Sequence, residues 1–319
     1  MSCLASVPTH ASSIQWQGSL LPQGFAWTSL DRPNQSPDGL IAGSRTVNGL
    51  DQVSVYNIYS AQFTLLGGLQ GHTYGNGISA NGRYVVGTGF NNASNNYQDG
   101  TRAVLSVDGQ PVQVLPTLGG NNANAADVNN AGQVVGTSTR ADGSSAAFIY
   151  QNGQMSELLP SLPGAAGGSS ASHINDAGDI AGDRWGQFGL MAFVIRGGQI
   201  EDISLGGNNS AVWGLNQAGW ATGYAFLAGS DPDMDAFVHL NGQTLNLDGL
   251  VSGLGLVDTQ YAYFNWDGDL IGLGSDALGN ERWFQLSALQ VSEPGALLLA
   301  GAGLLGAALA RRRRVTSKA

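Results

Sequence analysis

The stretch VNNAGQVVGTS, from Val128 to Ser138, decides the fold because its core recurs along the chain. INDAGDIAGD begins at Ile174 and LNQAGWATGY at Leu215, and further copies are ISANGRYVVGTG from residue 78, FNWDGDLIGLG from residue 264 and a degenerate SPDGLIAGS from residue 36. The aligned first glycines are Gly39, Gly82, Gly132, Gly178, Gly219 and Gly268. Self-similarity at a spacing of roughly 40 to 50 residues indicates a repeat architecture.

Each unit reads as four short antiparallel strands. The Asn-x-Ala-Gly core lies between two apolar runs and predicts a hairpin turn, in which Asn and Gly tolerate positive φ. The runs VVG and IAG predict short buried strands, each ended by a glycine that has little side chain to pack. A second run, AFIYQNGQMSELL from Ala147, predicts another hairpin with its turn at Asn152-Gly153, followed by the last strand.

Four strands in about 45 residues are typical of a propeller blade, and blades must stack because one blade cannot bury its own faces. We therefore predict an all-β chain, a β-propeller of about six four-stranded blades with a C-terminal hydrophobic helix. Blade counts of five and seven, a β-solenoid and a two-sheet sandwich are the alternatives. The segment SIQWQGSLLPQ (residues 13–23) reads as the hairpin half of a unit, and we expect it to complete the last blade, which we predict to end without a fourth strand of its own after RWFQL.

The charge is divided unevenly along the chain. The net charge is −10, yet five of the 13 basic residues lie in the last nine positions. The first 290 residues carry eight basic and 22 acidic side chains, a net charge near −14. Such a surface repels phosphate backbones and argues against a nucleic-acid partner. The single cysteine, Cys3, excludes an internal disulfide and a cysteine-based metal site.

The repeat also resembles a known family. The pattern AFxxxxGxxxxLxxLGG followed by INxxGxVVG, with the glycine pairs of LLGGL at Leu65, TLGG at Thr117 and SLGG at Ser204, resembles the HAF repeat of bacterial extracellular proteins. The resemblance covers roughly residues 24–290. It implies an extracellular location and a repeat architecture, and it implies no reaction.

The C-terminal end of the chain indicates the cellular location of the protein. Residues 296–310 are all Ala, Leu or Gly and are followed directly by four arginines. As a helix they would span roughly 22 Å, whereas the hydrocarbon core of a bilayer is about 30 Å thick. A core helix would not end in four arginines, and a basic cluster after an apolar run fixes that end on the cytoplasmic side. The body of the chain would then lie outside.

This C-terminal element resembles the PEP-CTERM sorting signal of Gram-negative bacteria, although its first proline is replaced by serine. The residues that match the signal are Ser292, Glu293, Pro294, Arg311, Arg312, Arg313 and Arg314. The resemblance implies an exosortase, a membrane transpeptidase, as partner, cleavage near the motif, and a transient inner-membrane helix at 296–310. It implies an inner-membrane-anchored precursor that is then released to the cell surface or extracellular matrix.

The N-terminus has no basic region and no apolar run of signal-peptide length. We expect residues 1–10 to be a leader remnant or disordered, residues 11–290 to be the HAF-repeat propeller, and residues 291–319 to be the sorting and transmembrane segment. A true start further upstream would supply the signal peptide that sorting requires, and a cytosolic protein with a tail anchor is the alternative.

Few residues suggest chemistry. Asp231, Asp233 and Asp235 alternate as in a calcium loop but lack its later Gly and Glu, so we interpret them as a polar loop between strands. Asp176, Asp179, Asp267 and Asp269 fall at the repeat turns, which indicates turn chemistry before calcium binding. The histidines His10, His72, His173 and His239 lack zinc spacing. No catalytic or phosphate-binding motif is present, so we expect no cofactor.

The seven tryptophans are Trp16, Trp27, Trp185, Trp213, Trp220, Trp266 and Trp283. We expect Trp213 and Trp220, which flank the Asn216 turn, to pack between blades, and sugar-stacking platforms are the alternative. The sequence thus predicts an exported, surface-sorted, non-catalytic repeat protein that binds extracellular polysaccharide or protein. The alternatives are an extracellular propeller hydrolase or lyase that acts on polysaccharide, and a structural matrix component.

Overall fold

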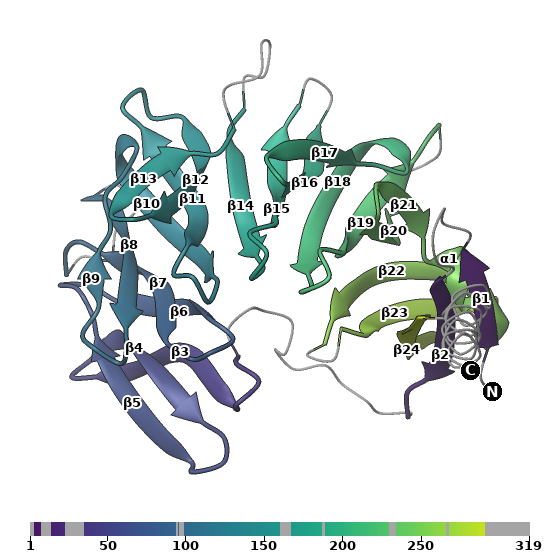
Figure 1. The fold of residues 1–319 in the computed structure, drawn as a ribbon, viewed down its shortest axis with the longest axis horizontal. Helices are drawn as coiled ribbons and strands as arrows, with labels where there is room; N and C mark the ends of the chain where they lie inside the picture. Colours follow the sequence, from purple (N-terminus) through teal and green to yellow (C-terminus); the bar gives the residue numbers. More distant parts are fainter. Residues whose placement is uncertain are drawn as a thin grey trace, which may run out of the picture.

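The computed structural model describes residues 3–7, 14–22, 35–93, 95, 99–159, 167–186, 189–229, 234–265 and 268–290. These residues form six antiparallel sheets that follow one another around an arc in the order of the chain (Figure 1). The arrangement confirms the all-β propeller architecture. Within the described part of the chain no helix has the length and apolarity to cross a membrane, and the predicted helix at 296–310 lies outside that part.

The first three sheets contain the strands from residue 40 to residue 157. Sheet one consists of β3 (Leu40–Val47), β4 (Leu50–Asn57) and β5 (Gln62–Gly67). Sheet two consists of β6 (Thr73–Ile78), β7 (Tyr84–Phe90), β8 (Thr101–Val107) and β9 (Gln113–Val114). Sheet three consists of β10 (Gly119–Val128), β11 (Val134–Arg140), β12 (Ser145–Gln151) and β13 (Gln154–Glu157).

The last three sheets complete the arc. Sheet four consists of β14 (Ser169–Ile174), β15 (Ile180–Trp185), β16 (Leu190–Arg196) and β17 (Gln199–Ile203). Sheet five consists of β18 (Gly206–Leu215), β19 (Ala221–Leu227), β20 (Met234–Leu240) and β21 (Gln243–Asn246), and the short helices α1 (Asp248–Val251) and η2 (Ser252–Leu254) follow it. Sheet six has the order β22 (Leu256–Phe264), β23 (Leu270–Asp276), β24 (Glu281–Gln290), β2 (Ile14–Leu20) and β1 (Cys3–Val7).

Sheets two to five have the four strands predicted for each blade, and the two end sheets depart from that number among the described residues. Sheet one has three strands there, and Gln35 adds a single bridge to Ile41. Sheet six has five strands, because it takes two from the N-terminus.

The two ends of the chain meet in sheet six. Strand β2 pairs with β24 along its whole length, from Ile14 opposite Gln290 to Leu20 opposite Phe284. This confirms that the N-terminal segment completes the last blade. Residues 13–23 do not form a hairpin by themselves, however: the partner of β2 on its other side is β1, in the stretch that we expected to be leader or disordered.

The repeated turn depends on two residues with different roles. In sheet three the turn glycine, Gly132, has φ of 76°. The aligned Asn129 does not adopt the positive φ that we expected for it. Its side-chain Oδ1 instead accepts the backbone N–H groups of Ala131 and Gln133, each at 3.1 Å. The second hairpin turn is as predicted, with positive φ at both Asn152 (52°) and Gly153 (81°), the geometry of a type I′ turn.

The glycine that we predicted to end the second strand lies inside it, since β11 continues from Gly136 to Arg140, and close packing explains why this residue is glycine. A Cβ built on Gly136 would lie 2.9 Å from the ring of Phe148 and still closer to the carbonyl oxygen of Asn124. A larger residue would therefore push β11 away from both of its neighbours. This explains why the VVG and IAG runs end in glycine.

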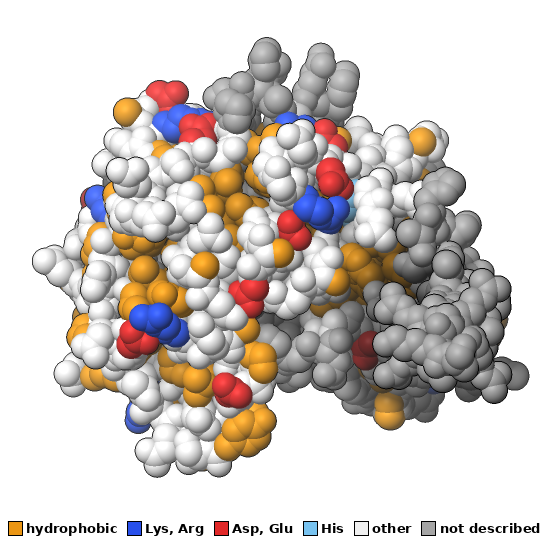
Figure 2. All heavy atoms as spheres, viewed as in Figure 1, with side chains coloured by type: hydrophobic (Ala, Val, Ile, Leu, Met, Phe, Trp, Pro, Cys, Tyr) orange, Lys and Arg blue, Asp and Glu red, His pale blue; other side chains and the backbone are white. Residues whose placement is uncertain are grey.

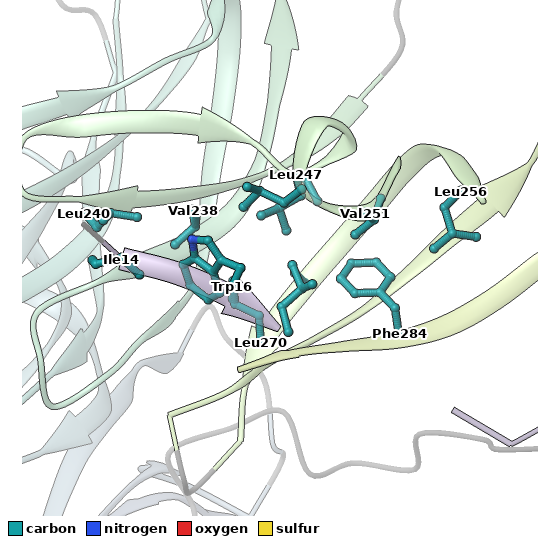
Figure 3. Packing of buried hydrophobic residues seen from close by; sticks show 13 residues of the cluster. Ile14, Trp16, Val238, Leu240, Leu247, Val251, Leu256, Leu270 and Phe284 are labelled. Atoms are coloured by element: carbon teal, nitrogen blue, oxygen red, sulfur yellow. The ribbon is translucent and has the colours of Figure 1, made fainter. Parts of the chain in front are cut away.

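The repeated phenylalanine of the third strand holds neighbouring sheets together. Four such residues, each with no exposed surface, are Phe148, Phe193, Phe237 and Phe284. Each belongs to the core cluster that joins its own sheet to the preceding one. Figure 3 shows this packing between sheets five and six, where Phe284 and Trp16 lie among leucine and valine side chains.

Apolar cores join successive sheets along the arc, whereas the two chain ends meet by strand pairing within sheet six. Five core clusters join sheets one to two, two to three, and so on to sheets five to six. Within the described residues no core cluster joins sheet six to sheet one.

Candidate binding cleft

A cleft of about 580 Å³ lies between sheets two and three. Its volume is within the range of roughly 300 to 1,000 Å³ that is common for ligand sites. Most of its side chains are amides and hydroxyls on β6, β7, β10 and β11. The lining residues are Ser44, Tyr74, Gly75, Asn76, Thr88, Phe90, Thr101, Asn122, Ala123, Asn124, Thr137, Ser138, Thr139 and Ser145.

A β-bulge aims Asn76 into the cleft. The register of β6 against β7 shifts between Gly75 and Gly77, and Asn76 is the extra residue. Bulges of this kind redirect one side chain out of the regular alternation. The Nδ2 of Asn76 donates across the sheet boundary to the carbonyl oxygen of Ala125 at 2.7 Å, and it lies 3.0 Å from the hydroxyl of Thr88.

Thr88 and Asn124 complete a polar group that bridges the two sheets. The Thr88 hydroxyl donates to Oδ1 of Asn124 at 2.7 Å. A second group lies deeper along β10, where Oδ1 of Asn122 accepts the backbone N–H of Thr101 at 2.9 Å. These contacts fix the orientation of three amide side chains before any ligand arrives.

The fixed amides leave donors and acceptors free. Among the described residues, no partner is present for the Nδ2 groups of Asn122 and Asn124, for Oδ1 of Asn76, or for the hydroxyl of Thr137. Asn124 is exposed, and Asn76, Asn122 and Thr137 are half-buried. The cleft therefore presents both donors and acceptors in held positions, an arrangement that suits a ligand rich in hydroxyl groups.

No charged side chain is among the residues that line the cleft in the described part of the chain. A nearby basic residue, Arg140, is bound by Glu157 at 2.6 Å. Figure 2 shows that charged side chains are sparse on this face and that basic groups lie beside acidic ones. The site thus offers hydrogen bonds without net charge.

Buried carboxyl groups join neighbouring sheets elsewhere. Asp127, on β10, accepts the backbone N–H of Val128 at 2.7 Å and that of Ile174, in the next sheet, at 2.9 Å. Burial raises the pKa of Asp127 to about 8. Asp183, on β15, accepts the N–H of Val212 at 2.9 Å, and burial raises its pKa to about 6. Both groups therefore hold protons more tightly than an exposed aspartate.

The turn aspartates take part in turn chemistry, as predicted. Asp176 accepts both the N–H and the Nδ2 of Asn130, at 2.8 and 2.6 Å, and so links the turns of sheets three and four. Asp179 accepts from Nδ2 of Asn175 at 3.1 Å. Asp269 receives Nε2 of Gln285 at 2.6 Å, and Asp267 lies outside the described residues.

We interpreted Asp235 as part of a polar loop, and for this residue the interpretation is wrong. Asp235 is a buried residue of β20, and Asn246 donates to it at 2.7 Å, while Asp231 and Asp233 lie outside the described residues. One carboxylate oxygen each of Asp235, Asp248 and Asp258 lie within 4.8 Å of one another. Burial raises the pKa of Asp248, and Thr259 donates to it at 2.6 Å. Neutral donors thus already stabilise this group from within the chain.

The histidines form local contacts. His72 lies 2.9 Å from Asp51, and His173 lies 2.8 Å from Ser172. His239 is buried between Thr244 at 3.0 Å and Glu201 at 3.0 Å. Within the described residues the one group of three metal-capable side chains is the acidic group above, which contains no histidine. His10 lies outside the described residues.

The tryptophans divide into two kinds. Trp16 is buried in the core between sheets five and six, with Trp220 packed against it at a ring distance of 5.8 Å, which confirms inter-blade packing for Trp220. Trp213 also bridges sheets five and six, but it contacts other aromatic rings and not a core cluster. Trp185 is 54% exposed. Trp27 and Trp266 lie outside the described residues.

Sequence reasoning did not find the cleft. Its residues are those at which the repeats differ from one another, so an alignment of the repeats on their shared residues does not single them out. The signal that could have found them is positional: Asn76 is the bulged residue, and Thr88 and Thr137 directly follow the aligned strand glycines. The predicted sorting residues Ser292 to Pro294 and Arg311 to Arg314 lie outside the described residues.

Comparison with known proteins supports both the propeller fold and the C-terminal sorting signal. The PEP-CTERM protein-sorting motif matches residues 290–314, which indicates a secreted, membrane-processed protein that an exosortase recognises. No curated protein matches the chain.

Two solved structures show the fold that this chain shares. The β-propeller domain of the Trilobed protease from Pyrococcus furiosus, described as having an open velcro topology, has a TM-score of 0.54 at 10% identity, with 92% of each chain covered. The acylaminoacyl peptidase of Pyrococcus horikoshii has a TM-score of 0.52 at 11% identity, with 94% of this chain and 54% of that one covered. At this identity the likeness shows the propeller fold alone.

Proposed function

We propose that this chain is an exported, surface-sorted and non-catalytic HAF-repeat propeller of a Gram-negative bacterium, which binds extracellular polysaccharide in the cleft between sheets two and three. The observation that carries the proposal is the set of free amide and hydroxyl groups held in place by Asn76, Thr88 and Asn124. A sugar offers donors and acceptors on every ring, which can pair with the donors and acceptors that the cleft holds in position.

The charge of the body narrows the kind of polysaccharide. The first 290 residues carry a net charge near −14, and no cation lines the cleft among the described residues. A polymer of uronic acids would meet repulsion and find no counter-charge. The proposed ligand is therefore an uncharged glycan.

The lining supports binding over cleavage. Hydrolysis of a glycosidic bond by the common route uses a pair of carboxyl groups beside the scissile bond. The residues that line the cleft in the described structure include no Asp or Glu. The hydrolase or lyase alternative would need its carboxylates elsewhere, and the structural alternative would leave the free groups of the cleft without a role.

Glycan binding is tested with the purified full chain on immobilised neutral glucans and on polygalacturonate. We expect retention on a neutral glucan, no retention on polygalacturonate, and at least about tenfold weaker binding for Asn124→Ala, because one lost hydrogen bond in a site that depends on it costs about 1 to 3 kcal/mol. The matched control is Asn81→Ala, an exposed asparagine at a repeat turn. Retention of Asn124→Ala equal to the wild type would contradict the proposal.

The sorting part has its own test. We propose that the segment at 296–310 spans the inner membrane only until an exosortase cuts near Pro294. Mass spectrometry of the mature protein from its native cell should give a C-terminus near Pro294. A mature chain that still carries Arg311 to Arg314 would show that the tail is not removed.

A further inference from the structure

The repeat places equivalent residues of several sheets on the same side of the arc. In each second strand the first and third residues after the aligned glycine share one face, because side chains alternate along a strand. In sheets two and three these are Thr88, Phe90, Thr137 and Thr139, all of which line the cleft. In sheets four and five they are Asp183, Trp185, Tyr224 and Phe226.

The bulge follows the same rule. Sheets two and five both carry it at the same point of the first strand, and the extra residue is Asn76 in sheet two and Trp213 in sheet five. Asn76 reaches across to the first strand of the next sheet. Trp213 does likewise, with ring distances of 5.6 Å to Tyr261 and 5.5 Å to Tyr263 on β22. Beside the cleft these positions hold Asn76 and Thr88, and in sheet five they hold Trp213 and Tyr224.

Six rings form a continuous group there, which we call the aromatic cluster. Its links are Trp213 to Tyr224 at 5.0 Å, Tyr224 to Phe226 at 6.4 Å, and Tyr261 to Trp283 at 6.2 Å. The members are Trp213, Tyr224, Phe226, Tyr261, Tyr263 and Trp283.

The aromatic cluster is not part of the hydrophobic core. All six rings are half-buried, and none belongs to or packs against any of the five core clusters of the described residues. Trp220, seven positions beyond the bulged Trp213, shows the contrast because it does pack against a core cluster. Half-buried aromatic rings outside a core are a feature of binding sites, where an apolar ring meets the ligand.

We infer that the aromatic cluster together with Trp185 forms a second carbohydrate subsite, which stacks the apolar faces of pyranose rings. Rings whose hydroxyl groups are all equatorial, as in β-linked glucans, expose flat C–H faces that fit against indole and phenol rings. The inference rests on the proposed function: one neutral glycan would bond through its hydroxyls to the cleft and lie with its ring faces on the aromatic subsite. The absence of cations from the cleft lining and the net negative body favour this uncharged occupant over a nucleic acid or an acidic polymer.

The test measures how affinity depends on chain length. Calorimetric titration of the full chain with cello-oligosaccharides and laminari-oligosaccharides of two to eight units should show affinity that rises at least tenfold with length for the wild type. For Trp213→Ala and Trp185→Ala the gain with length should be lost, while the affinity for the shortest binding oligosaccharide stays within about twofold. Trp185→Ala keeps the test valid if Trp213→Ala fails to fold, because Trp185 is more than half exposed. Tyr59→Ala, which removes a ring 77% exposed in sheet one, is the matched control.

The outcomes separate the two proposals. If no neutral oligosaccharide of any length binds the wild type, the proposed function and the inference both fail. If the wild type binds, but the aromatic variants keep the same gain with length, the second subsite alone is wrong. A wild type that binds all lengths equally also overturns the subsite. If an immobilised protein ligand binds at the aromatic residues and no oligosaccharide competes with it, the occupant of the aromatic subsite is not a carbohydrate.

Discussion

The two ends of each strand pair differ in what their side chains do. At the turn end, Asn129 and Asn175 occupy equivalent positions, and their side-chain amides form hydrogen bonds within the protein. Each donates to the backbone carbonyl of the next turn, Asn129 to Asn175 at 3.0 Å and Asn175 to Asn216 at 3.2 Å. At the other end, the residues after the strand glycine change from Thr137 to Asp183 and to Tyr224. Repetition therefore marks the positions that build the arc, and the positions available to a ligand are found among those that vary: Thr137 lines the cleft, although Asp183 joins sheets four and five.

Among the repeated positions, removal of a core phenylalanine should cause the largest loss of stability. Phe193→Ala would leave a cavity between sheets three and four, where the ring is fully buried. Substitutions of this kind cost about 3 to 5 kcal/mol of unfolding free energy. Urea unfolding followed by circular dichroism checks this. Thr137→Ala on the variable side should change the free energy by less than about 0.5 kcal/mol, and an equal loss in both variants would remove the distinction.

A pH titration of stability tests the buried carboxyl that joins sheets three and four. Burial raises the pKa of Asp127 to about 8 from its usual 3.8. Between these values the unfolded chain has released a proton that the folded protein keeps. The free energy of unfolding should therefore fall as the pH rises from about 4 to 8, by up to about 1.4 kcal/mol per pH unit.

Asp127→Asn removes the titrating group and keeps one acceptor for the two backbone N–H groups. Its unfolding free energy should depend less steeply on pH across the same interval. Chemical denaturation at pH 5 and pH 8 measures the difference. A variant whose slope matches the wild type would mean that Asp127 is ionised in the folded protein.

A smaller effect is expected from a single turn amide. Asn175→Ala loses the bond from the N–H of Asp179 at 2.9 Å and the bond to Asn216 in the next sheet. We expect a loss of about 1 to 3 kcal/mol, because each partner is left unsatisfied. Gln199→Ala, an exposed position on β17 of the same sheet, should cost less than about 0.5 kcal/mol. Thermal unfolding of both variants side by side gives the comparison.

The sequence predicted the parts of the fold that local chemistry determines. The Gly132 turn, the Asn152-Gly153 turn and the pairing of the N-terminal segment with the last blade were all readable, because glycine tolerance and alternating hydrophobicity are local signals. The role of Asn129 was misread, since a side-chain acceptor and a positive φ favour the same residue type.

The cleft could not be predicted for a different reason. Asn76 and Asn124 are 48 residues apart, and their contact depends on a bulge and on the angle between two sheets. The angle between the sheets leaves no pattern in the sequence, and the bulge becomes visible only once the strand register is known. The aromatic cluster was missed in the same way, because Trp213 and Tyr263 stack only across a sheet boundary.

The central claim is that the variable positions bind and the repeated positions hold the fold. The most direct measurement is calorimetric titration of cellohexaose or laminarihexaose into the wild type, Asn124→Ala and Asn175→Ala, with the melting temperature of each recorded in parallel. We predict that Asn124→Ala binds at least tenfold more weakly with an unchanged melting temperature, whereas Asn175→Ala melts earlier and binds like the wild type. The reverse assignment, or binding that neither variant alters, would contradict the account.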